Sequence, residues 1–181
     1  MRTKLIFIML LTAMAVSDRA VAAKSISNSK DYVIAKQVDL KGKTLKIPVG
    51  KRLFFKEGAR LINGVVIGNA TSIGGSRNKI FHNVRIMGSW NVPNISTLMF
   101  VDIEKDNSLV NVFALTNKNV KNVVTINLGD YWITVSKAWE YSIKVVDNTE
   151  IILNGTIRLR PNGFKGCKML NLSGNNIYLH G

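Results

Sequence analysis

Cysteines and acidic residues are scarce in this chain, and their scarcity limits what can hold it together. The 181 residues include one cysteine, 11 aspartates and glutamates, and 25 lysines and arginines, which gives a net charge of +14 at pH 7. Because Cys167 has no partner within the chain, no intrachain disulfide can form. Its apolar neighbours Phe164, Met169 and Leu170 favour a buried core thiol over a reactive one.

Histidines and paired carboxylates are also few, which limits the chemistry that the chain can perform. His82 and His180 are the two histidines, too few for a zinc site of three or four protein ligands. Glycoside hydrolysis uses two carboxyl groups that flank the scissile bond, but no Asp-Asp pair and no Asn-x-Asp motif occurs. Glu104 and Asp106 are interpreted as loop charges. We therefore expect no metal and no cofactor, and the sequence identifies no catalytic residue.

The segment 1–22 has the features of a secretory signal peptide. Arg2 and Lys4 precede an apolar stretch from Leu5 to Val16, and Ala20-Val21-Ala22 provides a cleavage site. The apolar stretch is shorter than the roughly 20 residues that a membrane-spanning helix needs. We expect an exported protein that is secreted, periplasmic or at the cell surface, with no stable membrane span after cleavage.

A repeat of about 20 residues, a period typical of solenoids, dominates the N-terminal half. Its apolar segments begin at Leu45, Val65 and Val84. We expect these three residues to lie in one column. Asn63 and Asn83 come just before two of the segments and predict bends in the chain.

The C-terminal part shows a similar spacing. Ile151-Ile152-Leu153 resembles Leu170-Asn171-Leu172, and Ile157-Arg158-Leu159 resembles Ile177-Tyr178-Leu179. Each pair is again separated by about 20 residues. We therefore expect these segments to pair as neighbouring strands.

Regular glycines between β-branched and aromatic runs predict an all-β body. The Gly74-Gly75-Ser76-Arg77 segment lacks the Lys-Ser/Thr ending of a phosphate-binding loop, and we interpret it as a bend. One short α-helix is expected near residues 108–117, where Ser108 can cap an apolar stripe that begins at Leu109. Further short strands are expected at 98–103, 123–126, 132–135 and 142–146.

Several segments resemble the right-handed parallel β-helix proteins of the pectate-lyase-like superfamily, as exported by Bacteroidetes. Asp106-Asn107-Ser108 through Ala114-Leu115 is similar to the helix that opens such domains, and Gly129-Asp130-Tyr131-Trp132-Ile133 is similar to the strand that follows it. Two later segments, 154–159 and 172–181, look like successive coils, and Val38–Trp90 is similar to the smaller β-solenoid that often precedes the main helix. His180-Gly181 also resembles a family motif, although we interpret His180 as a residue at a turn or strand end.

The resemblance implies a right-handed parallel β-helix with the following domains. Residues 1–22 form the signal peptide, 23–37 a linker, 38–97 a small N-terminal β-solenoid, and 98–181 the start of the main β-helix. Because the chain ends directly after an expected strand, we expect an N-terminal fragment of a longer protein.

The resemblance implies a relative of pectate lyases and polygalacturonases, so the full-length protein could be a polysaccharide lyase or glycoside hydrolase. The alternative is a non-catalytic surface structure or a module that binds acidic glycans. Either way the expected partner is an acidic polysaccharide or cell-surface glycan rather than nucleic acid. The candidate ligand-binding residues are Arg158, Arg160, Trp132 and Tyr141, because guanidinium groups bind carboxylates and aromatic rings stack on sugars.

A concentration of positive charge supports a polyanionic partner, although a solubilising surface is the alternative. Seven cations fall within the segment 41–60: Lys41, Lys43, Lys46, Lys51, Arg52, Lys56 and Arg60.

Overall fold

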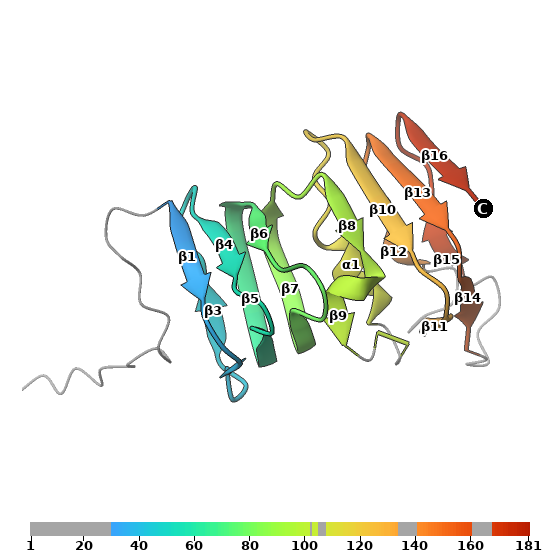
Figure 1. Ribbon diagram of the computed structural model, residues 1–181. Coiled ribbons are helices and arrows are strands. Elements are labelled where there is room, and N and C mark those ends of the chain that lie inside the picture. Colours follow the sequence, from blue (N-terminus) through green and yellow to red (C-terminus); the bar gives the residue numbers. More distant parts are fainter. Residues whose placement is uncertain (1–29, 102, 105–107, 134–140, 161–167) are drawn as a thin grey trace, which may run out of the picture.

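The computed structural model describes residues 30–101, 103–104, 108–133, 141–160 and 168–181. Strands in parallel pairs make up most of these residues, together with the 3-10 helix η1 (Thr97–Met99) and the α-helix α1 (Leu109–Phe113). The predicted all-β body with one short α-helix is therefore confirmed (Figure 1). The expected signal peptide and Cys167 lie outside the described residues.

The N-terminal half contains two parallel sheets. The first has the order β1-β4-β6, and the second has the order β2-β5-β7-β9, with β3 also paired to β5. Their strands are β1 (Asp31–Ile34), β2 (Val38–Asp39), β3 (Thr44–Lys46), β4 (Arg52–Phe55), β5 (Leu61–Thr71), β6 (Ile73–Gly75), β7 (Phe81–Trp90) and β9 (Phe100–Val101). Strand β1 lies within the segment that was expected to be a linker.

Neighbouring strands in these sheets are one sequence repeat apart. In the first sheet, Leu53 of β4 lies between Tyr32 and Ile73. Asp31 and Arg52, which are partners in the same sheet, are 21 residues apart, so the predicted period is confirmed for this half. Figure 1 shows the consequence, because strands that follow one another in a sheet also follow one another along the molecule.

The predicted column of Leu45, Val65 and Val84 is wrong by one residue at Val65 and by two residues at Val84. Leu45 pairs with Val66, and Val66 pairs with Ile86, whereas Val65 lies opposite Thr44. Successive strand side chains point to opposite faces, so a shift of one residue exchanges the inner and outer positions. Val66 and Ile86 are buried, which identifies them as the inward positions.

The bends predicted at Asn63 and Asn83 fall inside strands β5 and β7 rather than between short strands. Both residues have left-handed backbone conformations, with φ of 55° and 51°. The Asn83 Nδ2 donates to Asn63 Oδ1 at 3.0 Å, and the Asn63 Nδ2 donates to Asp39 Oδ1 at 3.2 Å. Asparagine tolerates this conformation better than most residues, and here its side chain also links one repeat to the next.

The C-terminal half contains three further parallel sheets, with the orders β8-β10-β13-β16, β11-β14 and β12-β15. Their strands are β8 (Asn94–Ser96), β10 (Asn122–Ile126), β11 (Asp130–Ile133), β12 (Tyr141–Lys144), β13 (Thr149–Leu153), β14 (Thr156–Leu159), β15 (Lys168–Asn171) and β16 (Ile177–His180). Strand β8 falls in a segment that sequence analysis did not assign to a strand.

The pairing expected in this half, with a spacing close to that of the N-terminal repeat, is wrong. Ile151 pairs with Leu179, and Ile157 pairs with Tyr131 rather than with a residue of β16. The repeat is longer here, as the bonded side chains of Asn148 and Asn176 show, because these residues precede β13 and β16 and are 28 residues apart. Several strands in this half, such as β10, β11 and β13, carry a similar apolar alternation, so likeness between two segments does not identify which of them are neighbours.

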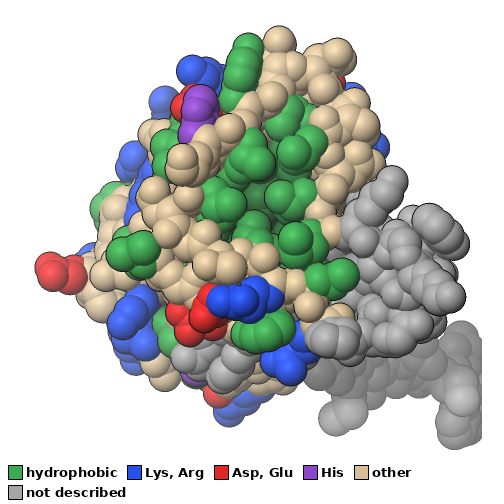
Figure 2. Space-filling model, turned by 90° about the vertical axis from the view of Figure 1, so that its right-hand side faces the viewer, with side chains coloured by type: hydrophobic (Ala, Val, Ile, Leu, Met, Phe, Trp, Pro, Cys, Tyr) green, Lys and Arg blue, Asp and Glu red, His purple; other side chains and the backbone are tan. Residues whose placement is uncertain are grey.

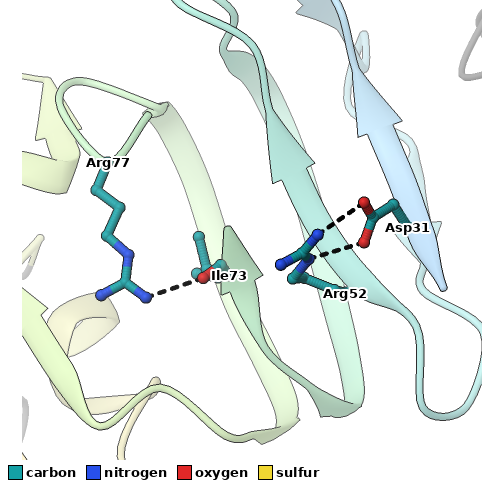
Figure 3. Close-up of polar contacts among 4 residues, drawn as sticks. All are labelled: Asp31, Arg52, Ile73 and Arg77. Atoms are coloured by element: carbon teal, nitrogen blue, oxygen red, sulfur yellow. Dashed lines mark hydrogen bonds and ion pairs between the residues drawn. The ribbon is translucent and has the colours of Figure 1, made fainter. Parts of the chain in front are cut away.

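Arg77 connects the first sheet of the N-terminal half to β8. Its Nη2 donates to the carbonyl oxygen of Ile73 at 2.9 Å, and its Nη1 donates to that of Asn94 at 3.1 Å. Figure 3 shows the contact with Ile73, at the start of β6. A guanidinium group therefore binds two backbone acceptors where one sheet ends and the next begins.

Helix α1 covers the edge of β7. Leu109, Val112 and Phe113 are buried, which confirms the expected apolar stripe. The backbone N–H of Ile86 donates to Asn111 Oδ1 at 2.9 Å, so an amide side chain takes the place of a neighbouring strand. Ser108 is the N-cap residue of α1, as predicted, but its side chain makes no capping hydrogen bond.

The buried apolar side chains form a core cluster that runs through both halves. Within it, the Phe81 ring lies 5.6 Å from that of Phe55 and 5.3 Å from that of Phe100, measured between centroids. These aromatic contacts join side chains from successive repeats, so burial in one repeat depends on its neighbours.

The end formed by β14, β15 and β16 exposes apolar side chains. Figure 2 faces this end and shows hydrophobic groups gathered in the middle of a polar rim. Tyr178 and Leu179 of β16 are 58% and 48% exposed. Exposed strand edges of this kind favour association with other chains.

The glycines at 74 and 75 differ from the expected bend. Gly74 lies in β6, where it pairs with Phe54 of β4. Of the two glycines, only Gly75 has a left-handed conformation, with φ of 75°. A Cβ at Gly75 would overlap the carbonyl oxygen of Phe55. Gly58 has a similar φ of 69°, but nothing lies within 4 Å of a Cβ placed there.

This contrast predicts different costs for two matched substitutions. Gly58→Ala should lower the free energy of unfolding by about 1 kcal/mol, the cost of a left-handed alanine. Gly75→Ala should lower it by about 3 kcal/mol, because a steric overlap is added to the same strain. Urea denaturation followed by circular dichroism measures both values, and equal losses would contradict the close approach at Gly75.

Candidate functional site

Strand alternation places Trp132 and two arginines on one outer surface. Strands β11 and β14 are parallel neighbours, with Trp132 opposite Arg158. Tyr131 and Ile133 point into the core, where both are buried, so Trp132 points outward. Arg158 and Arg160 are exposed on the same surface. We call Asp130, Trp132, Arg158 and Arg160 the Trp132 surface.

The two guanidinium groups lie over the Trp132 ring. Arg160 Cζ is 5.2 Å and Arg158 Cζ is 6.0 Å from the ring centroid, distances at which a cation is attracted to an aromatic face. Arg158 Nε also lies 3.0 Å from Asp130 Oδ1, in an ion pair whose side chains are 49% and 56% exposed. The contacts hold the ring and both cations close together at the surface.

These contacts define the chemistry that the Trp132 surface can offer. Guanidinium groups can bind a carboxylate through two parallel hydrogen bonds, and an indole ring offers a flat apolar surface. Asp130 is already bound to Arg158, so a ligand carboxylate must share or replace that contact. Of the predicted residues, Trp132, Arg158 and Arg160 are brought together. Tyr141 lies in β12, and its side chain lies outside the described part of the structure.

The described residues hold no group of three or more histidine, cysteine, aspartate or glutamate side chains that could bind a metal ion. His180 is the last residue of β16, as expected for a strand-end histidine, and its Nε2 lies 3.5 Å from Glu150 Oε1. Glu150 Oε2 also lies 3.8 Å from Lys121 Nζ. His180 therefore contacts one carboxylate that is shared with a lysine.

A second cluster of arginine, aromatic ring and aspartate was missed by sequence analysis. Arg52 Cζ lies 5.2 Å from the Phe54 ring centroid. Arg52 also donates two hydrogen bonds to Asp31, from Nε to Oδ1 at 2.7 Å and from Nη2 to Oδ2 at 2.8 Å. Figure 3 shows this pair between β1 and β4. The alternation in Arg52-Leu53-Phe54 was a usable signal, because it places the first and third side chains on one face.

A hollow of about 640 Å³ lies beside β7. Its lining includes the two asparagines of the bends, Asn63 and Asn83, together with Arg85 and Asn111. The lining offers amide groups and one guanidinium, so the hollow can donate hydrogen bonds to a polar ligand. Its lining contains none of the four ligand-binding residues predicted from sequence, Trp132, Tyr141, Arg158 and Arg160.

Comparisons of the chain with protein-family models, curated proteins and solved structures find no match. A search of the described residues also finds no helix with the length and hydropathy needed to span a membrane. A functional interpretation therefore depends on the surface chemistry described above.

The Asp31–Arg52 pair predicts a specific pH dependence of stability. The hydrogen bond from Arg52 lowers the pKa of Asp31 below its ordinary value of 3.8. The unfolded chain then binds more protons than the folded chain near this pH, so the stability from this pair is present above about pH 4 and is lost as the pH falls through the lowered pKa. Between about pH 5 and pH 2, the wild type should lose stability more steeply than Asp31→Asn. Denaturation midpoints of the two proteins across this range measure the difference, and parallel curves would show that the pair makes no contribution.

Proposed function

We propose that this chain forms an exported parallel β-helix and that its Trp132 surface binds an acidic polysaccharide. The observation that carries the proposal is the Trp132 ring with the guanidinium groups of Arg158 and Arg160 over it. Uronate sugars present a carboxylate beside an apolar ring face, and this surface offers a partner for each.

Three features support a β-helix as the finer description of the fold. Strands pair in parallel with the strands one repeat away. The chain changes direction at the asparagine bends, and Asn63 and Asn83 are linked from repeat to repeat. A right-handed path is proposed because nearly all crossovers between parallel strands have that hand. This form agrees with the resemblance to the pectate-lyase-like superfamily.

Export and charge agree with a polysaccharide as the partner. The signal-peptide features of residues 1–22 favour a secreted, periplasmic or surface protein, which meets glycans outside the cytoplasm. Removing these residues takes away three cations and Asp18, so the net charge falls from +14 to +12. A protein of this charge attracts polyanions over long distances.

We favour binding over cleavage for this chain. Cleavage of a glycosidic bond by hydrolysis needs two carboxyl groups that face each other across the bond. Asp130 is the single carboxylate of the Trp132 surface, and it is paired with Arg158. The proposed relation to lyases and hydrolases therefore concerns the fold and the class of ligand, and it does not include their catalytic activity.

Binding of trigalacturonate measured by isothermal titration calorimetry tests the proposal. The Trp132→Ala substitution should weaken binding about fivefold to tenfold, because stacking and cation–π contacts are lost. The double variant Arg158→Ala with Arg160→Ala should weaken it by about tenfold or more, because charge-assisted hydrogen bonds are lost.

The control variant combines Lys46→Ala and Lys144→Ala, which removes two exposed charges on β3 and β12. It should bind trigalacturonate as the wild type does, and neutral trigalactose should bind weakly to all proteins. Equal losses in the control and the arginine variant would show that only net charge matters. Release of shortened products from polygalacturonate by the purified chain would contradict a purely binding role.

A further inference from the structure

Cations from three successive repeats meet at one corner of the N-terminal half. The corner consists of the connections that lead from the β1-β4-β6 sheet to the β2-β5-β7 sheet, which are residues 35–37, 56–60 and 76–80. We call Lys36, Lys56 and Lys79 the corner lysines. All three are exposed, and each comes from a different connection.

Backbone hydrogen bonds show that the three connections are direct neighbours. The N–H of Lys56 donates to Ile34 O at 2.9 Å, and the N–H of Ser76 donates to Phe55 O at 2.9 Å. At the other end of the connections, the N–H of Val38 donates to Arg60 O at 2.9 Å. Parallel strands lie about 4.8 Å apart, so the corner lysines lie on three successive levels that span roughly 10 Å, with Lys56 directly after β4 and Lys79 close to the start of β7.

Charge at this corner is strongly one-sided. The three connections contain five cations and one carboxylate, Glu57. Arg60 is half-buried beside the corner lysines, and the Arg77 guanidinium binds the carbonyl oxygens of Ile73 and Asn94. These two arginines add positive charge to the same connections, in which the three lysines are exposed. Like charges at a surface repel one another across the solvent, and an anionic ligand would reduce that repulsion.

We propose that the corner lysines bind an extended acidic polysaccharide along the line of the repeats. Lysine is a flexible point charge with three donors, suited to a chain whose carboxylates recur at every sugar unit. The inference rests on the proposed function, because it takes a polyuronate as the ligand. It adds a second contact, at the corner lysines, which a short oligosaccharide bound at the Trp132 surface does not need.

The dimensions favour a polysaccharide over nucleic acid. The corner offers three lysines on short connections, whereas protein–DNA interfaces bury roughly 600 Å² or more of protein surface. Single-stranded nucleic acid is usually held by aromatic side chains that stack on its bases, and the three connections contain no aromatic residue.

The test compares a long and a short ligand on two charge-matched triple variants of the full chain. The corner variant carries Lys36→Gln, Lys56→Gln and Lys79→Gln. The control variant carries Lys46→Gln, Lys118→Gln and Lys144→Gln, which removes three exposed charges elsewhere. Affinity for polygalacturonate should fall about tenfold in the corner variant and less than about twofold in the control. Its salt dependence should also become shallower in the corner variant.

The short ligand separates this inference from the proposed function. Trigalacturonate should bind the corner variant and the wild type equally. If it binds at the Trp132 surface but both triple variants hold polygalacturonate equally, the corner assignment is wrong and the proposed function stands. If trigalacturonate does not bind but polygalacturonate does so through the corner, the corner assignment stands and the Trp132 site is wrong. Equal, corner-dependent binding of a single-stranded oligonucleotide of matched charge would overturn the polysaccharide as partner.

Discussion

Backbone pairing between strands one repeat apart is the constraint on which the rest of this structure depends. Phe81 pairs with Leu61 on one side and with Phe100 on the other, and the strands of the first sheet are paired in the same way. Successive repeats therefore lie directly against one another, and the turns of one repeat must fit closely on the turns of the repeat before it. This requirement accounts for the left-handed asparagines at the bends and for the glycine at 75, where a side chain would meet the backbone of the previous repeat.

Side chains replace backbone partners where the repeat changes length. The bonded asparagines of the N-terminal bends are 20 residues apart in the sequence, whereas those that precede β13 and β16 are 28 residues apart. Between these regions Asn111 accepts from the N–H of Ile86, and Arg77 donates to two carbonyl groups. Asn117 also donates to the carbonyl oxygen of Trp90 at 2.9 Å. Polar side chains thus form hydrogen bonds with backbone N–H and C=O groups that a strand in the wrong register could not reach.

The sequence predicted the repeat in the N-terminal half, where each apolar segment resembles one segment about 20 residues away and few others. It predicted the bends at Asn63 and Asn83 because few other residues tolerate that conformation. The register was missed because Val65 and Val66 are both apolar, so composition does not show which one points inward. In the C-terminal half the strands of a single repeat resemble one another, and the partners of β13 and β14 could not be chosen by similarity. Alternation did place Arg158 in β14 and Arg160 directly after it on one face. Their position beside Trp132 depends on the pairing of β14 with β11, which no local pattern reveals.

The arrangement of pairing also determines how the molecule would respond to mechanical load. Strands are held through hydrogen bonds to their neighbours in the same sheet, and these bonds lie nearly along the direction in which the repeats follow one another. A pull applied at opposite ends along that line would open one pair of strands at a time, as a zip opens, rather than shear many bonds together. The contacts of Arg77 and Asn117 lie where the repeat changes length. Strand separation that passes this point would move from the shorter repeats of the N-terminal half to the longer repeats of the C-terminal half.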